Sequence, residues 1–436
     1  MKSLGIDIGT TTISTAVVEN GAVIDSETWE NGCFLSPSLP GERAQDIGAI
    51  EETVNRALDA ALLRHPDLKR IGVTGQMHGI LYVDRRGNAL SPLYTWQDAR
   101  GDAPCEKSAD GASWSESLSR ETGLSVPTGY GFVTHAYNLA HGLVPPETAY
   151  LCTIGDYIAM KLCGGAAPVM DASNAASLGF FSLKTRMFDY AALRQVGIDP
   201  MVAPPIALTP LIGRFRNTVG VSVAIGDNQA SFLASVKDRN AEMLVNVGTG
   251  SQFSVFSERC MQAEGLETRP MPGGGYLLAG ASLCGGRAYA LLEQFFRSTA
   301  SMLGTETNSC YDAMARLLNE NPRPDDVPAV CTLFEGTRAD SSLTGSISGL
   351  TTHNFTPLHL IYGVMDGMAD ELHRMYTAYR QAGGTPKRLI GSGNGLRQNR
   401  YLQQRFESAF GCPLTLSDGR EEAAAGAAQF AAEQQI

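Results

Sequence analysis

The feature that most constrains this 436-residue chain is a motif that occurs twice, a strand pattern that ends in a Gly-Thr turn. The first copy is Asp7-Ile8-Gly9-Thr10, and the second is Asn246-Val247-Gly248-Thr249. Each copy is followed by a further matching segment, Arg-Ile-Gly-Val at residues 70–73 and Arg-Leu-Ile-Gly at residues 388–391. Repetition in the same order predicts two halves built on one plan, although short matches of this kind also arise by coincidence.

The boundary between the two halves is expected in the polar run at residues 236–242. This boundary predicts an N-terminal domain at residues 1–238 and a C-terminal domain at residues 239–436.

Strand patterns alternate with amphipathic helical patterns in both halves. Residues 46–64 and 358–381, for example, carry apolar side chains at helical spacing. The alternation predicts layered α/β domains with mixed sheets. Two stretches rich in Gly, Ser, Asp, Glu or Pro, at residues 101–130 and 301–327, interrupt it, and we expect surface insertions or lids there.

The charge balance excludes several classes of function. The chain has 34 Lys and Arg against 45 Asp and Glu, a formal net charge of −11, whereas nucleic-acid or anionic-membrane surfaces need clustered cations. No uncharged apolar run approaches the roughly 18 residues of a membrane span, and Asp7 in the first apolar stretch argues against a secretory signal. The nine cysteines include no C-x-x-C pair, which predicts reduced, mostly buried thiols in a cytoplasmic protein.

Small residues follow the first strand of each half, where backbone N–H groups and hydroxyls can wrap a phosphate. These turns consist of Gly9, Thr10, Thr11 and Thr12 in the first half and of Gly248, Thr249 and Gly250 in the second. Asp7 is placed to hold a hydrated magnesium ion beside the first turn. One such turn alone is more often a tight hairpin, but two that face each other could grip a nucleoside triphosphate.

A third glycine-rich turn lies near the C-terminus. Gly393-Asn394-Gly395 follows a strand pattern and precedes a helix expected at residues 399–410. Glycines at such a position allow a flat nucleotide to approach closely. A plain loop that caps the helix is an equally good interpretation of this segment alone.

Asp227 is the candidate general base. An apolar strand delivers it at the head of a helix expected at residues 229–236. Removal of a proton from a sugar hydroxyl during phosphoryl transfer needs one carboxylate within hydrogen-bond reach. An aspartate in this position also serves as an ordinary helix N-cap, so the position alone does not decide between the two roles.

Two segments have the side chains expected of a polyol site. Gln76, Met77 and His78 lie between glycines at the end of a strand, and Trp96 and Asp98 supply an aromatic face and an acceptor. Taken alone, His78 is more often a hydrogen-bonded structural histidine and Trp96 more often a core residue.

Together, these segments resemble the FGGY carbohydrate kinases, a family with the actin-like ATPase fold. The resemblance covers essentially the whole chain in the family's order. It rests on residues 5–11, 75–79, 96–100, 226–230, 246–250, 345–366, 391–413 and 419–428. It implies an α/β chain of two similar domains with the actin-like ATPase (ribonuclease H-like) fold and an interdomain cleft.

The resemblance also implies the roles of the site residues, with ATP and Mg²⁺ bound and a sugar as the second substrate. Asp7 would hold the metal, and Asp227 would be the base in the sugar-binding N-terminal domain. The residues expected to contact the sugar are Gln76, Met77, His78, Trp96, Asp98 and Asn228. The residues expected to contact ATP are Gly9, Thr10, Thr11, Thr12, Gly248, Thr249, Gly250, Gly393, Asn394 and Asn399.

Within the family, residues 95–98 and 393–399 are most similar to the sedoheptulokinases, which implies a ketose 7-phosphate as the product. The segment at 76–79 is shared with xylulokinases, so a pentulose kinase remains the alternative. A catalytically silent sugar sensor on the same fold is the alternative from another class.

Ser14 stands where many members carry Lys or Arg, which puts an extra cationic contact to the γ-phosphate in doubt. The sequence implies no nucleic-acid or membrane partner and leaves a homodimer open.

Overall fold

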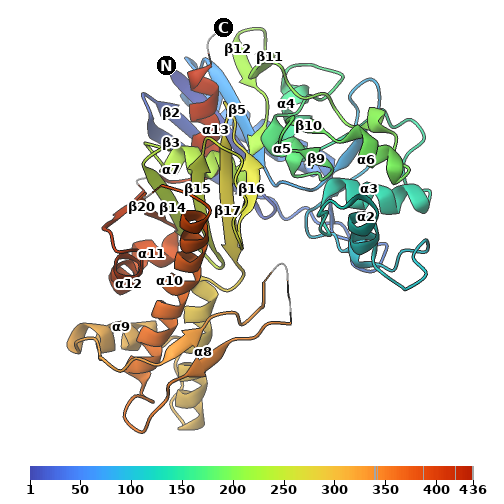
Figure 1. Cartoon of the computed structure of the whole chain (residues 1–436). Helices are drawn as coiled ribbons and strands as arrows, with labels where there is room; N and C mark the ends of the chain where they lie inside the picture. Colours follow the sequence, from blue (N-terminus) through green and yellow to red (C-terminus); the bar gives the residue numbers. More distant parts are fainter. Residues whose placement is uncertain (338–339, 341, 386, 418, 435–436) are drawn as a thin grey trace. The chain divides into compact units, whose positions relative to one another are not determined.

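The computed structural model describes residues 1–337, 340, 342–385, 387–417 and 419–434. The chain forms two compact units, labelled by element in Figure 1. The first unit contains Met1–Ala234, Arg269–Gly275 and Gly419–Ile436, and the second contains Ser235–Thr268 and Tyr276–Asp418. Among the helices in these described residues, none combines the length and the hydropathy that crossing a membrane requires.

A seven-stranded mixed sheet forms the centre of the first unit, with the order β11-β12-β5-β1-β2-β3 and β13 paired to β5. β1 runs antiparallel to β2 and parallel to β5. The strands are β1 (Lys2–Ile8), β2 (Thr12–Glu19), β3 (Ala22–Glu30), β5 (Arg70–Gly75), β11 (Leu211–Phe215), β12 (Val219–Ser222) and β13 (Ile225–Gly226). Three short pairs lie outside this sheet: β4 (Ala44–Gln45) with β7 (Leu93–Tyr94), β6 (Leu81–Val83) with β8 (Tyr150–Cys152), and β9 (Phe181–Ser182) with β10 (Met187–Phe188).

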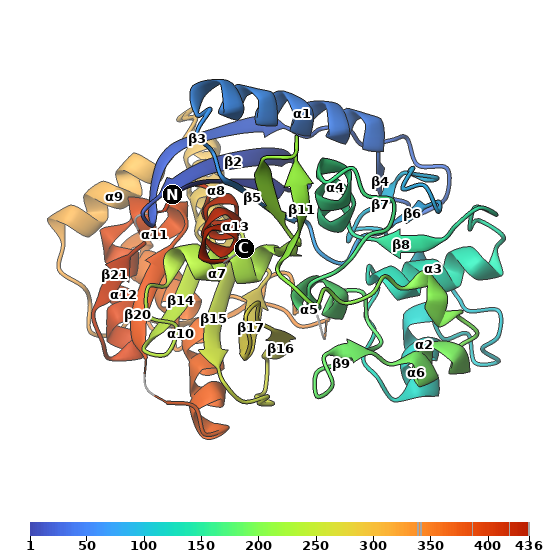
Figure 2. The ribbon, with the colours of Figure 1, turned by 90° about the horizontal axis from the view of Figure 1, so that it is seen from above.

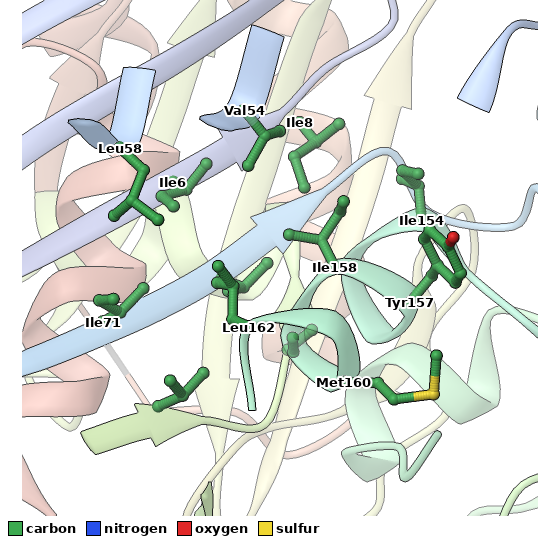
Figure 3. Packing of buried hydrophobic residues seen from close by; sticks show 14 of the residues in the cluster. Ile6, Ile8, Val54, Leu58, Ile71, Ile154, Tyr157, Ile158, Met160 and Leu162 are labelled. Atoms are coloured by element: carbon green, nitrogen blue, oxygen red, sulfur yellow. The ribbon is translucent and has the colours of Figure 1, made fainter. Parts of the chain in front are cut away.

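Helices pack on both faces of the first sheet. The helices of this unit are α1 (Ile47–Arg64), α2 (Trp114–Thr122), α3 (Gly131–Ala140), α4 (Ile154–Leu162), α5 (Ala172–Ala176), α6 (Tyr190–Gln195), α7 (Asp227–Ser235, whose last residue opens the second unit) and α13 (Glu422–Glu433). Ile6 and Ile8 of β1 pack with residues of α1 and α4 in one hydrophobic cluster (Figure 3). Figure 2 shows α1 along β2 and β3.

α13 packs against the opposite face of the sheet so closely that no side chain fits between its backbone and the strands at Gly5 and Gly72. Gly5 and Gly72 are paired neighbours on β1 and β5, and a Cβ on either would lie within 2 Å of a backbone oxygen of α13, at 1.7 Å and 1.9 Å. On the helix itself, a Cβ at Gly426 would lie 1.8 Å from the carbonyl oxygen of Ala230 in α7. The absence of side chains at these positions therefore lets α13 hold the sheet and α7 together.

The second unit repeats the plan of the first. Its sheet contains the order β17-β15-β14-β20-β21, and β14 runs antiparallel to β15 and parallel to β20. Its strands are β14 (Glu242–Val247), β15 (Ser251–Ser257), β17 (Tyr276–Ser282), β20 (Arg388–Ser392) and β21 (Leu414–Leu416), with a separate pair β18 (Ala329–Cys331) and β19 (Ser346–Ser348) and with β16 (Glu267–Pro270) at the boundary of the units. Its helices are α8 (Gly286–Met302), α9 (Tyr311–Glu320), α10 (Pro357–Gln381), α11 (Asn394–Gln398) and α12 (Arg400–Phe410).

This shared plan confirms the predicted repeat and the α/β class. In both units, the strand before the first Gly-Thr turn pairs in parallel with the strand of the second matching segment. Asp7 pairs with Thr74, and Asn246 pairs with Ser392. The echo in the sequence therefore reflects the same strand pairing and not a coincidence.

Two expectations were wrong in part. The stretches at 101–130 and 301–327 do not lie only on the surface, because each contains a helix with two buried apolar residues four positions apart, a spacing hidden among polar neighbours. These residues are Trp114 and Leu118 in α2 and Met314 and Leu318 in α9. All nine cysteines are free thiols, as predicted, but only Cys105, Cys152 and Cys284 are buried.

Candidate functional site

Three parallel strands of the first unit end in register at one edge of the sheet. Ile8 of β1 pairs with Gly75 of β5, and Gly75 pairs with Gly226 of β13. The residues that follow are Gly9, Gln76 and Asp227. Sheet pairing therefore brings the predicted phosphate turn, sugar segment and base to the same carboxyl edge, where α/β folds bind their ligands.

The first phosphate turn connects β1 to β2. Its backbone is held from outside, because Asn31 donates from its side chain to the carbonyl oxygen of Gly9 (2.7 Å) and from its backbone to that of Thr11 (2.8 Å). Thr11 and Thr12 are exposed, and Thr10 is partly exposed. The turn is thus anchored through its carbonyl groups, while its outer side remains accessible.

Asp7 experiences strong negative charge from its neighbours. Burial, followed by the nearby charges of Asp227 and Glu421, raises the pKa of this carboxyl to about 7. Glu421, just before α13, accepts a hydrogen bond from the Thr28 hydroxyl (3.0 Å). A cation would relieve this concentration of charge. No group of three or more His, Cys, Asp or Glu side chains in the described residues could hold a metal by itself.

The predicted sugar segment bends sharply after β5. His78 has a φ of 72°, a left-handed conformation that is uncommon without glycine, and Gly79 N–H donates to the Met77 carbonyl across it (2.9 Å). The imidazole stacks on Tyr130, with ring centroids 4.4 Å apart. Its Nδ1 lies 2.8 Å from the Ser177 carbonyl oxygen, which only accepts, so Nδ1 carries the proton. Strain of this kind persists where the surroundings fix it.

Met77 links the sugar segment to the segment that carries Asp227. Its side chain lies against Gly226, where a Cβ would come within 2.9 Å of the thioether sulfur. The amide nitrogen of Asn228 lies 4.0 Å from the same sulfur. Asp227 begins α7, and its Oδ1 accepts from the backbone N–H of Asn228 (2.6 Å).

The short helix α5 and the residues that flank it also support this edge, and the sequence analysis missed them. The Ser173 hydroxyl accepts from the N–H of Gly226 (3.0 Å) and donates to Asp171 (2.5 Å). The Ser177 hydroxyl accepts from the N–H of His78 (3.1 Å). One turn of helix therefore holds both the base segment and the sugar segment. Small hydroxyl residues in a short helix carry no periodic pattern that could have revealed them.

Trp96 and Asp98 lie in different environments. The indole of Trp96 is 43% exposed and donates to the Thr10 hydroxyl (3.0 Å), which connects it to the phosphate turn. Asp98 is fully buried, and its two oxygens accept four hydrogen bonds, one from the N–H of Arg43 and three from Arg100. A carboxylate with four donors has no acceptor site left for a sugar hydroxyl. Its contacts therefore do not support the predicted role of Asp98 in sugar binding.

Asp98→Asn is expected to lower the melting temperature and to leave sugar affinity within about twofold. The substitution removes the charge that compensates the Arg100 guanidinium, at a cost of about 2 kcal/mol, or roughly 4 to 8 °C. Differential scanning calorimetry and sugar titration measure the two effects. A tenfold loss of sugar affinity at unchanged stability would show instead that Asp98 contacts the ligand.

The second phosphate turn, Gly248 to Gly250, lies against the N-terminus of α8. Gly248 N–H donates to the carbonyl oxygen of Gly250 (2.9 Å), while the carbonyls of Gly248 and Thr249 accept from Gly286 and Arg287 (2.9 Å and 3.0 Å). A Cβ at Gly286 would lie 2.4 Å from the Gly248 oxygen. The exposed Thr249 thus lies beside the positive end of a 17-residue helix, which favours an anion.

The third glycine turn of the sequence lies next to the second phosphate turn. Gly393 has a φ of 86°, and a Cβ there would lie 2.4 Å from the carbonyl oxygen of Val247. Asn394 is exposed at the start of α11. Asn399 caps α12, where its side-chain oxygen accepts from two backbone N–H groups at 3.0 and 3.1 Å. The parallel pairing of β14 with β20 therefore brings the turn at 248–250 and the turn at 393–394 to one edge of the sheet, whereas Asn399 caps α12.

The chain is similar to known proteins along nearly its whole length. Residues 3–233 match the N-terminal domain of the FGGY family of carbohydrate kinases, and residues 243–434 match its C-terminal domain. Sedoheptulokinase from Mus musculus is 28% identical over 98% of this chain and 96% of its own length. Xylulose kinase from Staphylococcus xylosus is 24% identical, with 98% and 90% covered. The structure of xylulose kinase from Rhodospirillum rubrum has a TM-score of 0.83 at 22% identity, with 99% and 90% covered.

Proposed function

Because the chain belongs to the FGGY family of carbohydrate kinases, we propose that it transfers the γ-phosphoryl group of ATP to the terminal hydroxyl of sedoheptulose. The product is sedoheptulose 7-phosphate. The choice of sugar rests on the similarity to relatives named sedoheptulokinase along nearly the whole chain. Relatives named xylulose kinase make xylulose the second candidate.

The alignment of Asp227 with the phosphate turn and the sugar segment is the observation that carries this proposal. Asp227 follows Gly226, in register with the strand ends that precede Gly9 and Gln76. In the proposed mechanism, Asp227 accepts the proton of the sugar hydroxyl as its oxygen attacks the γ-phosphorus. Gln76, His78, Asn228 and Trp96 orient the sugar, and Met77 packs beneath it. In each unit, the Gly-Thr turn, at 9–12 in the first and at 248–250 in the second, offers backbone N–H groups and hydroxyls to phosphate oxygens.

The residues around Asp7 fit a magnesium ion bound with the nucleotide. Mg²⁺ is held in many kinases by one or two carboxylates together with phosphate oxygens and water. Asp7 provides such a carboxylate, and the negative charges of Asp227 and Glu421 act on it. When bound, the ion would neutralise charge on the transferred phosphoryl group.

The affinity for Mg-ADP is expected to fall as the pH decreases below about 7. The pKa of Asp7 is raised to about 7, so at lower pH a proton occupies the carboxyl that the metal needs. Above pH 8 the carboxylate is already ionised, and the affinity should be flat. Calorimetric titration from pH 5.5 to 8.5 measures this profile.

Asp7→Asn is the control for this profile, because it leaves only the titration of the nucleotide itself. Asp227→Asn should shift the midpoint to lower pH, since the charge of Asp227 contributes to the raised pKa. Identical profiles for Asp7→Asn and the wild type would contradict the assignment of the metal to Asp7.

The sugar is identified by the rate of ADP release with Mg-ATP and a series of polyols. We would compare sedoheptulose, xylulose, ribulose, fructose, gluconate and glycerol with a blank that contains no sugar. A kcat/KM at least about tenfold higher for sedoheptulose supports the proposed substrate. A higher value for a pentulose would replace the substrate and keep the mechanism.

A further inference from the structure

Three side chains of the first unit form a closed ring of hydrogen bonds between the phosphate turn and the sugar segment. The Thr10 hydroxyl donates to Oε1 of Gln76 (3.3 Å), and Nε2 of Gln76 donates to Oε1 of Gln45 (2.8 Å). Nε2 of Gln45 then donates to the backbone carbonyl of Thr10 (2.8 Å). Gln45 is fully buried in β4, Gln76 is 4% exposed, and neither β4 nor Gln45 was expected from the sequence to contribute to the site.

Two backbone carbonyls fix the direction of every bond in this ring. Nε2 of Gln45 donates to the carbonyls of Thr10 and Asn31 (2.8 Å and 3.2 Å), and carbonyls only accept, so the amide cannot be reversed. Oε1 of Gln45 must therefore face the NH₂ group of Gln76. Oε1 of Gln76 must then face Thr10, so the Thr10 hydroxyl donates its proton to this oxygen. The oxygen of the Thr10 hydroxyl remains an acceptor. The Trp96 indole N–H provides the donor for that acceptor.

The single proton of the Thr10 hydroxyl is consequently directed toward the sugar segment when neither ligand is bound. A sugar hydroxyl that donates to Oε1 of Gln76 shares the two lone pairs of this acceptor with Thr10 and weakens the 3.3 Å hydrogen bond between Thr10 and Gln76. The Thr10 hydroxyl can then rotate and donate to a phosphate oxygen. A phosphate that takes this proton likewise leaves Gln76 as an acceptor for the sugar. The two ligands thus assist each other's binding through one shared hydrogen bond.

We propose that Gln45 is a positioning residue that couples sugar binding to nucleotide binding by fixing the orientation of the Gln76 amide. Gln45 touches neither substrate. Without it, Gln76 is free to present either its oxygen or its NH₂ group to Thr10, and the link between the ligands is lost. The proposal rests on the proposed function, because it takes Gln76 as a sugar contact and Thr10 as a phosphate contact.

The test measures, by calorimetry, how tightly the protein binds the magnesium complex of a non-hydrolysable imido analogue of ATP. The dissociation constant of this complex is determined with and without saturating sedoheptulose or xylulose. The ratio of the two constants is the coupling factor. We expect about tenfold coupling in the wild type, within the usual range for linked sites. Gln45→Met, which has a similar shape but no donor, should reduce the factor to less than about threefold.

Asn138→Leu is the matched control. Asn138 is another fully buried amide of the first unit, hydrogen-bonded to Tyr82 and Arg100 away from the ring. Its loss should destabilise the protein and leave the coupling factor unchanged. Thr10→Val, at a partly exposed position, is the second variant and should also abolish the coupling, so the test does not depend on whether Gln45→Met folds.

The outcomes are distinguishable. Coupling that is lost in Gln45→Met and Thr10→Val but kept in Asn138→Leu supports the inference. The inference would be overturned if folded Gln45→Met or Thr10→Val kept the full coupling factor. It would also be overturned if the wild-type protein bound the two ligands independently. Each of these results would leave the proposed function intact. A wild type that binds the nucleotide but no sugar contradicts the proposed function itself, and the inference with it.

Discussion

Asp227→Asn is expected to lower kcat by about three orders of magnitude, the middle of the range for loss of a general base. The substitution keeps the shape of the side chain but removes its ability to accept a proton from the sugar hydroxyl. Sugar affinity should change by less than about threefold, because binding relies on the other groups at this edge. Steady-state kinetics and sugar titration separate the two quantities.

Asp189→Asn provides the matched control for this variant. Asp189 also begins a helix of the first unit, where its side chain accepts from the N–H groups of Ala191 and Ala192. Asparagine caps helices about as well as aspartate, so kcat should remain within about twofold of the wild type. A similar, small loss in both variants would indicate that Asp227 is only a helix cap.

Gly72→Ala is expected to destabilise the first unit by about 3 kcal/mol, at the upper end of ordinary overpacking costs. The added Cβ would lie 1.9 Å from the carbonyl oxygen of Ala427, and a backbone atom of α13 cannot move aside as a flexible side chain would. The melting temperature should fall by roughly 6 to 12 °C. Because α13 also contacts α7, kcat should fall together with stability.

Gly32→Ala is the control for this effect of the added methyl group. A Cβ at Gly32 would meet no atom within 4 Å, and its backbone does not adopt a positive φ. Its melting temperature should stay within about 2 °C of the wild type. If the melting temperature of Gly72→Ala also stayed this close to that of the wild type, α13 would not pack on the sheet as described.

The plan of the fold can be predicted from the sequence because local strand and turn patterns occur in the same order in both halves. The strand before each Gly-Thr turn and the second matching segment gave the same parallel pair in both units. Asp46 and Asn399, both expected near helix starts, cap α1 and α12. Local periodicity and cap residues determine such features, and they require no knowledge of distant contacts.

The supporting residues of the site could not be predicted in the same way. Gln45 belongs to a two-residue strand, and its partners in the hydrogen-bonded ring are 31 and 35 positions away along the chain. Asp98 was expected to face a sugar, because its neighbours resemble a polyol site, but the buried Arg100 occupies its carboxylate. Nothing in the alanine-rich sequence of α13 indicates the strands on which this helix packs. In each case, long-range contacts decide the role of a residue type that has several common uses.

The most direct test of the central claim is phosphorus NMR of the wild-type protein with Mg-ATP and sedoheptulose, against a blank without sugar. We expect a new phosphate monoester resonance that grows in step with ADP, in a product with the mass of a heptulose monophosphate. Asp227→Asn should form almost none in the same time. Equal release of ADP and inorganic phosphate with no sugar phosphate, for sedoheptulose and for xylulose, would contradict the account.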